Sequence, residues 1–192
     1  EGGYVYAEPG AYKKVALLDV ESMHPTSIEQ LNLFGKYTEK FSEIKRARLA
    51  IKHGDFKTAS SMMGGKLAKY LNDKADAKNL SNALKTVINS VYGLTSAKYQ
   101  NEFKDPRNID NIVAKRGALF MIDLKHAVQE KGYTVAHIKT DSIKIPDADD
   151  YIIKFVKDFG KKYGYNFDHE ATYEKMCLVN NAVYIAKYVP AN

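Results

Sequence analysis

Two aspartates each adjoin an apolar stretch of the sequence, where an uncompensated carboxylate is costly to bury. Asp19 lies in the apolar run 15–20, and Asp141 lies in the short connection between the apolar segments 133–138 and 143–146. A shared divalent cation would compensate both charges, and carboxylates on adjacent strands commonly hold Mg²⁺ against the phosphates of a nucleotide. The alternative is that Asp19 caps a turn and Asp141 hydrogen-bonds its own backbone. Sequence separation leaves both interpretations open.

A second set of polar residues follows the spacing of one helix face. Lys85, Asn89 and Tyr92 stand at positions i, i+4 and i+7, which point in one direction on a helix. A cation, an amide and an aromatic ring so placed can bind a triphosphate, hydrogen-bond a neighbour and contact a base or sugar. The alternative is an ordinary amphipathic helix, in which Tyr92 packs and Lys85 is solvated.

The middle third of the chain, residues 36–98, is a basic and helical segment. It holds 13 basic and 5 acidic residues, a net charge of +8, whereas the rest of the chain carries −2. It has no proline, and its apolar residues recur every three to four positions, as in a helix. These residues are Phe41, Ile44, Ile51, Leu80, Leu84, Val87 and Val91, with Arg48 on the same stripe. We expect two or three helices that form a basic insertion.

The flanking segments predict an α+β fold, with helices on one face of an antiparallel sheet. The run 15–20 is typical of a buried strand, and Gly132 and Gly164 each end an amphipathic segment. The predicted helices are 108–130 and 149–163, and the predicted strands are 133–138, 143–146, 165–167, 174–179 and 182–188.

Length and composition exclude several classes of protein. The 192 residues, 45% hydrophobic and 27% charged, suffice for one domain of ordinary size with an insertion. Cys177 is the only cysteine, so a disulfide framework and a zinc finger are excluded. No apolar run reaches the ~18 residues of a membrane span, and the N-terminus lacks the features of a signal peptide. We expect an intracellular protein with no membrane partner.

Three short motifs resemble those of one enzyme family, the family B DNA polymerases. Residues 19–26, Asp-Val-Glu-Ser-Met-His-Pro-Thr, are similar to the first polymerase motif, and residues 139–142, Lys-Thr-Asp-Ser, resemble the third. Residues 85–93 match the second motif, Lys-x-x-x-Asn-Ser-x-Tyr-Gly, at every fixed position. The motifs occur in the family's order, and residues 2–12 are similar to the segment that leads into the first. The resemblance covers nearly the whole chain.

The resemblance implies a ferredoxin-like palm with an antiparallel sheet and an inserted helical fingers subdomain. The expected parts are palm in residues 1–35, fingers in 36–98 and palm again in 99–192. The implied activity is template-directed DNA synthesis from dNTPs on a DNA primer–template. Family members also have a 3′–5′ exonuclease and a thumb, which a full-length or split protein would supply here. A phage or plasmid type is implied, located in the cytoplasm of a bacterial or phage-infected cell.

The family motifs also imply roles for individual residues. Asp19 and Asp141 would ligate two Mg²⁺ ions, which Mn²⁺ can replace, and the Val20 carbonyl would add a ligand. The nucleotide would be bound by the backbone amides of Ser22 and Met23, and by His24, Lys85, Asn89 and Tyr92. Arg48 and Lys52, one helical turn apart, resemble a further phosphate-binding pair. Thr140 and Tyr184 resemble positions that contact the primer or the DNA.

Three positions depart from the family pattern. Lys139 replaces an acid, Ala182 replaces the lysine of a Lys-x-Tyr element, and His24 replaces a tyrosine whose ring blocks a ribose 2′-hydroxyl. If Lys139 and Asp141 share a strand register, they face the same side. Lys139 then opposes cation binding, or it meets a phosphate or pairs with Glu21.

These departures motivate alternative hypotheses. The first is a catalytically weak or inactive palm that binds nucleotide or nucleic acid as part of a larger or split polymerase. Another is a nucleotide cyclase, against which the complete second motif argues, because a cyclase has no need of that helix. The last is a basic α+β domain with no catalytic role.

Overall fold

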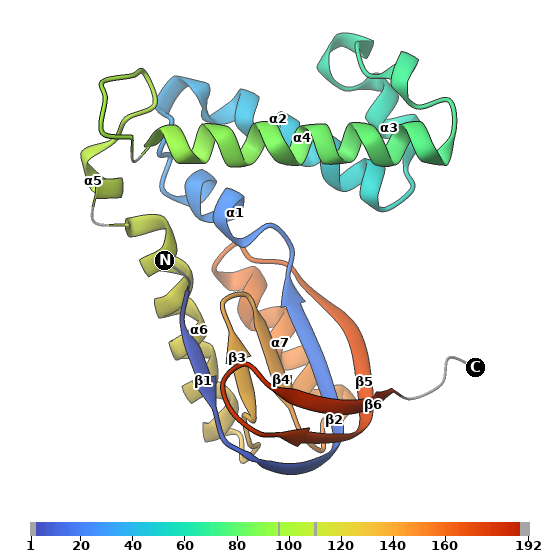
Figure 1. Cartoon of the computed structure of the whole chain (residues 1–192), viewed down its shortest axis with the longest axis vertical. Coiled ribbons are helices and arrows are strands. Elements are labelled where there is room, and N and C mark those ends of the chain that lie inside the picture. Colours follow the sequence, from blue (N-terminus) through green and yellow to red (C-terminus); the bar gives the residue numbers. More distant parts are fainter. Residues whose placement is uncertain (1–2, 96, 110, 189–192) are drawn as a thin grey trace. The chain divides into compact units, whose positions relative to one another are not determined.

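The computed structural model describes residues 3–95, 97–109 and 111–188, without the side chain of Ile109. The chain divides into two compact units (Figure 1). Glu1–Ser27 and Val113–Asn192 form the first, here called the sheet unit, and Ile28–Ile112 form the second, here called the helical unit. The predicted α+β class is confirmed. The basic segment 36–98 lies within the helical unit.

The sheet unit is built on six antiparallel strands in the order β1-β3-β4-β2-β5-β6. The central strand β2 is long and apolar, and it pairs with β4 on one side and β5 on the other. It contains the run 15–20, which confirms the predicted buried strand. The strands are β1 (Val5–Ala7), β2 (Gly10–Val20), β3 (His137–Lys139), β4 (Ser142–Ile145), β5 (Phe167–Leu178) and β6 (Tyr184–Tyr188).

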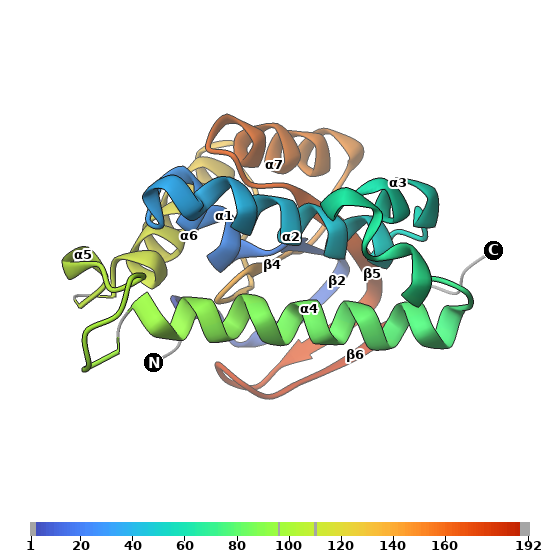
Figure 2. The same cartoon turned by 90° about the horizontal axis from the view of Figure 1, so that it is seen from above.

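Helices α6 (Ile112–Glu130) and α7 (Asp150–Lys162) pack on one face of this sheet (Figures 1 and 2). Apolar side chains of both helices, among them Met121 and Ile152, form one buried cluster with Leu18 of β2. Because successive side chains of a strand point to opposite faces, Asp19 lies on the other face. We call that second face, opposite α6 and α7, the open face.

Two or three helices were predicted in the segment 36–98, and its described residues, 36–95 and 97–98, form three α-helices, which confirms that number. Helices α2 and α4 run side by side (Figure 2), and Ala47, Ile51 and Leu84 pack between them. The helices are α2 (Thr38–Lys52), α3 (Phe56–Ser61), α4 (Lys74–Thr95) and the short α5 (Pro106–Ile109), with 3-10 turns at Gly35–Tyr37, Met63–Gly65 and Ala68–Tyr70. Helix α1 (Met23–Gln30) begins in the sheet unit.

Several element boundaries differ from the sequence-based predictions. The helix predicted from 108 begins at Ile112, because Asn111 adopts a left-handed φ of 59° that interrupts the helical path. The strand predicted at 133–138 is confined to His137–Lys139. The two strands predicted at 165–167 and 174–179 are one continuous strand, β5, because it pairs along the full length of β2.

Candidate active site

Strand register places four side chains in one row across the open face. Asp19 of β2 pairs with Ser142 of β4 on one side and with Asp168 of β5 on the other. Ser142 in turn pairs with Lys139 of β3. Directly opposed residues of antiparallel strands have their side chains on the same face, about 5 Å apart. The row therefore reads Lys139, Ser142, Asp19, Asp168, with a cation at one end and two carboxylates at the other.

Asp141 reaches this site from a turn rather than from a strand. Thr140 and Asp141 form the connection between β3 and β4, and Thr140 has a left-handed φ of 54°. The Thr140 amide donates to the Tyr4 carbonyl at 2.9 Å, and the Val20 amide donates to the Asp141 carbonyl at 2.8 Å. The second bond holds Asp141 at the end of β2 that carries Asp19. The predicted short connection that contains Asp141 is confirmed, and this turn interrupts the alternation that would put Lys139 and Asp141 in one strand register.

His24, on α1, lies close enough to Asp141 for their charges to interact. Burial raises the pKa of the half-buried Asp141 carboxyl, and the nearby His24 partly opposes that shift. Burial likewise lowers the pKa of His24, and the charge of Asp141 partly opposes it. A desolvated carboxylate of this kind gains most from a bound cation.

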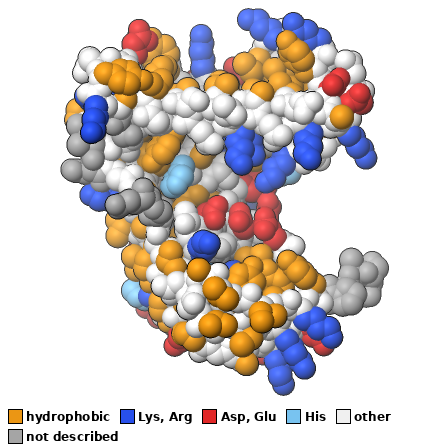
Figure 3. All heavy atoms as spheres, in the orientation of Figure 1, with side chains coloured by type: hydrophobic (Ala, Val, Ile, Leu, Met, Phe, Trp, Pro, Cys, Tyr) orange, Lys and Arg blue, Asp and Glu red, His pale blue; other side chains and the backbone are white. Residues whose placement is uncertain are grey.

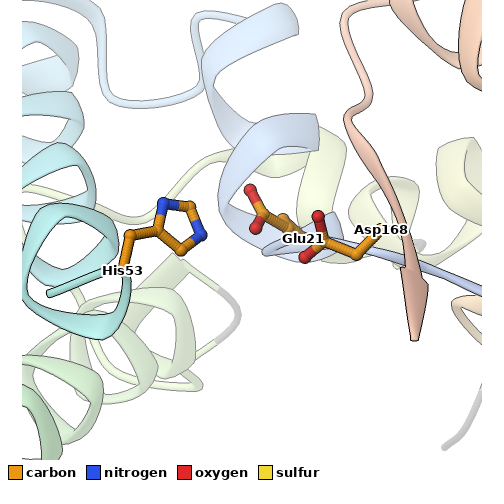
Figure 4. Close-up of side chains that lie close together, drawn as sticks. All are labelled: Glu21, His53 and Asp168. Carbon is orange, nitrogen blue, oxygen red and sulfur yellow. The ribbon is translucent and has the colours of Figure 1, made fainter. Parts of the chain in front are cut away.

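Two further carboxylates at this site were not predicted from the sequence. The Glu21 amide donates to the Asn166 carbonyl at 2.8 Å, so the chain leaving β2 is held against the chain entering β5. The carboxylates of Glu21 and Asp168 lie close together, with ligand oxygens within 4.8 Å (Figure 4). The third residue labelled there, His53, belongs to the helical unit. The signal that the sequence offered for Asp168 is its position directly after the segment 165–167, which was predicted to be a strand.

The donor set suits a hard divalent cation. Strand pairing and backbone hydrogen bonds bring four acids to this end of the sheet: Asp19 on β2, Glu21 just after it, Asp141 in the β3–β4 turn and Asp168 on β5. Carboxylate oxygens are ligands that Mg²⁺ prefers. Figure 3 shows a group of acidic side chains on the sheet unit with a basic side chain beside it. The predicted Val20 carbonyl belongs to the same end of β2.

The backbone after β2 turns sharply into a helix. Ser22 has a left-handed φ of 53°, and its carbonyl accepts the Thr26 amide at 2.9 Å. Helix α1 begins at Met23, so the predicted amides of Ser22 and Met23 lie at a helix N-terminus. Amides in the first turn have no partner within the helix, and together with the helix dipole they favour an anion.

The residues predicted on the second motif occupy a single helix, α4, of the helical unit. Lys85 and Asn89 are exposed, whereas Leu84 and Ile88 are buried on the opposite side of the helix. Tyr92 is half-buried, its hydroxyl lies 3.5 Å from Asn111 Oδ1, and burial raises its pKa. On α2, Arg48 is partly buried and Lys52 is exposed.

Tyr184 of β6 has a cation beside it that sequence analysis did not find. Lys144 of β4 is only 4% exposed, and its Nζ lies 4.5 Å from the centre of the Tyr184 ring. The same ammonium donates to His137 Nδ1 at 3.1 Å, and His137 Nε2–H donates to the Asn181 carbonyl at 2.8 Å. The β5–β6 hairpin thus reaches back across the open face. Position 182, where the Lys-x-Tyr element has its lysine, is alanine here, but Lys144 places a different lysine beside Tyr184.

Comparisons with known proteins support the fold. No family model matches the chain, and no curated protein matches it. Among solved structures, the family B DNA polymerase from the hyperthermophilic archaeon Pyrobaculum calidifontis is similar, with a TM-score of 0.66 over 98% of this chain and 16% identity. The chain spans 28% of the length of that polymerase. No helix in the described residues is long and apolar enough to cross a membrane. At this identity the likeness shows a palm-like α+β fold.

Proposed function

We propose that this chain is the palm and fingers part of a DNA polymerase and that it catalyses template-directed transfer of a nucleotide from a dNTP to a primer 3′-hydroxyl. The observation that carries the proposal is the convergence of Asp19, Asp141 and Asp168 at one end of the open face. The likeness in fold to a solved family B DNA polymerase supports it. The phage or plasmid type stays a prediction.

The residues have distinct roles in this proposal. Asp19 and Asp141 would hold two Mg²⁺ ions, with Asp168 and Glu21 as further oxygen donors. Ions so held supply activation of the 3′-hydroxyl and neutralisation of the charge that develops on the triphosphate. Because burial raises the pKa of Asp141, a proton competes with the cation for this carboxylate.

The remaining groups bind and orient the substrates. The Ser22 and Met23 amides at the start of α1 donate hydrogen bonds to phosphate oxygens. Lys85, exposed on α4, offers a cation for a phosphate. His24 lies beside Asp141 and presents an imidazole where the nucleotide sugar would approach. Tyr184, supported by Lys144, contacts the primer.

The proposed partners are a DNA primer–template and dNTPs. A chain that spans 28% of a polymerase is expected to need further regions, such as a thumb, to bind duplex DNA well. Whatever binding remains should weaken steeply with salt, because phosphate contacts dominate it.

Primer extension tests the proposal. A labelled primer on a template, all four dNTPs, Mg²⁺ and low salt would be combined with the wild type, Asp19→Asn and Asp141→Asn. Asp123→Asn, an exposed acid on α6, is the matched control. We expect products from the wild type and the control and none from the two site variants. Equal extension by Asp141→Asn and the control would contradict the proposed site.

A second function is favoured by one observation, the cation Lys139 in the same row as Asp19. A positive charge near the carboxylates weakens cation binding, so the chain would bind nucleotide or nucleic acid without catalysis. Calorimetric binding of dNTP with Mg²⁺ that is lost in Asp19→Asn, together with no extension at any Mg²⁺ concentration, would establish this second function.

A further inference from the structure

The open face is divided into an acidic part and a basic part. The acids Asp19 and Asp168 lie on β2 and β5, whereas Lys139 and Lys144 lie on β3 and β4. Lys139 and His137 alternate along β3, and their partners Ser142 and Lys144 alternate along β4, so all four share the open face. The boundary between the two parts runs between β4 and β2 and crosses the row between Ser142 and Asp19.

Lys139 is the accessible cation of the basic part. Its side chain is exposed, and no ion pair joins it to any residue that the structure describes. Lys144 is different, because it is buried and already contacts His137 and the Tyr184 ring. Burial, and secondarily the charge of Lys139, lower the pKa of Lys144, so the two ammonium groups interact. An anion placed at Lys139 would relieve this repulsion.

The position of Lys139 suits one part of a polymerase substrate. Two strand spacings of about 4.8 Å separate its backbone from that of Asp19, and the lysine side chain can span much of that distance. If the primer 3′-hydroxyl reacts at the carboxylates, the primer continues away from them over the sheet. Its nearest backbone phosphates then need a cation on the open face that is close to Asp19 but outside the carboxylate group. Lys139 meets both conditions.

We propose that Lys139 binds a backbone phosphate of the primer strand within its last two linkages. This inference rests on the proposed function and deepens it. Lys139 stands where the third polymerase motif has an acid, and the inference gives this lysine a role in substrate binding. The charge at position 139 would thus serve primer affinity, at some cost to cation affinity.

A binding experiment without chemistry tests the inference. The full chain would be titrated against a fluorescein-labelled primer–template in Ca²⁺, with wild type, Lys139→Gln and the control Lys13→Gln, an exposed lysine at the other end of β2. We expect Lys139→Gln to lose roughly tenfold in affinity at low salt, as for a charged hydrogen bond. The slope of log Kd against log salt should fall by about one. Lys13→Gln should change neither.

Neutral linkages locate the contact. A methylphosphonate would replace each of the last three primer phosphates in turn. We expect one of the last two replacements to weaken wild-type binding and to leave Lys139→Gln binding unchanged, since the partner charge is already gone. Equal losses in both proteins at every linkage would overturn the inference, and so would a raised KM for dNTP with unchanged primer affinity.

The outcomes separate this inference from the proposed function. A wild type that extends primers, with Lys139→Gln binding as tightly as wild type, refutes the role of Lys139 alone. A wild type that shows the linkage-specific loss but never extends refutes catalysis alone. A wild type that neither binds nor extends refutes both. Circular dichroism of Lys139→Gln would verify that the exposed substitution leaves the fold intact.

Discussion

The charge at position 139 should control the affinity of the site for Mg²⁺. Lys139 and Asp19 are separated by one strand in the row across the open face, which places a cation bound at Asp19 about 10 Å away, or two strand spacings. Replacing Lys139 with Gln removes one positive charge, and replacing it with Asp reverses the charge. Both changes should therefore tighten Mg²⁺ binding.

Coulomb's law gives the size of the effect. Removing one unit charge about 10 Å from a divalent ion in a water-like dielectric contributes about 0.8 kcal/mol, which is roughly a fourfold gain in affinity. Reversal to Asp doubles the energy to about 1.7 kcal/mol, or roughly fifteenfold. In about 0.1 M salt, where the Debye length equals the separation, the gains should shrink to about twofold and threefold.

Calorimetric titration of Mg²⁺ into the protein at low ionic strength would measure these values. Lys13→Asp, the same charge reversal at the far end of β2 and about 20 Å from Asp19, is the control. It should give about half the energy of Lys139→Asp, which is roughly a fourfold gain. If the effect is purely electrostatic, the fold-gain in Mg²⁺ affinity for Lys139→Asp should equal the square of the fold-gain for Lys139→Gln. A clearly larger gain would mean that the new carboxylate binds the ion directly. The through-space reasoning would be refuted by no gain in Mg²⁺ affinity in either Lys139 variant, or by a gain in Lys13→Asp as large as that in Lys139→Asp.

Four other predictions concern single residues. Burial lowers the pKa of His137, so the neutral form of this histidine stabilises the fold above the ordinary histidine pKa. This stability is lost as the pH falls below about 6.5. Chemical denaturation at several pH values should therefore show that His137→Gln loses less free energy of unfolding on acidification than the wild type. Gly160→Ala should lower the free energy of unfolding by roughly 1–3 kcal/mol, because its Cβ would lie 2.8 Å from the Tyr165 carbonyl oxygen. Gly93→Ala, with no atom within 4 Å of the new Cβ on α4, should instead raise the thermal midpoint. Asp168→Asn should weaken Mg²⁺ binding in calorimetry, and unchanged affinity would remove Asp168 from the site.

The sequence predicts the site best where one element decides the outcome. The apolar run 15–20, which contains Asp19, becomes part of the central strand, since a continuous run of this kind is typical of a buried strand. The spacing of Lys85 and Asn89 predicts their shared exposed face on α4, because Leu84 and Ile88 must pack on the other side. Both predictions depend on local periodicity alone.

The sequence cannot reveal contacts that depend on strand register. Asp168 faces Asp19 only because the pairing of β2 with β5 shifts between Leu17 and Leu18, and a slip of one residue would turn Asp168 to the face that α6 and α7 cover. The contact between Lys144 and Tyr184 likewise requires the β5–β6 hairpin to reach across the open face. The spacing of apolar residues in β5 and β6 does not predict where this hairpin lies on the sheet.

The turn at Thr140 explains why a lysine can stand next to a metal-binding acid in the sequence. A regular strand through 139–141 would place the ammonium beside the carboxylate, whereas the left-handed Thr140 breaks that alternation. Lys139 instead shares its row with Ser142, and the hydroxyl position lies between the cation and Asp19. At about 10 Å in water, the opposition to a bound ion is modest, while a direct contact with a phosphate is short-ranged and stronger. A cation at this distance can therefore favour the substrate strand more than it disfavours the metal.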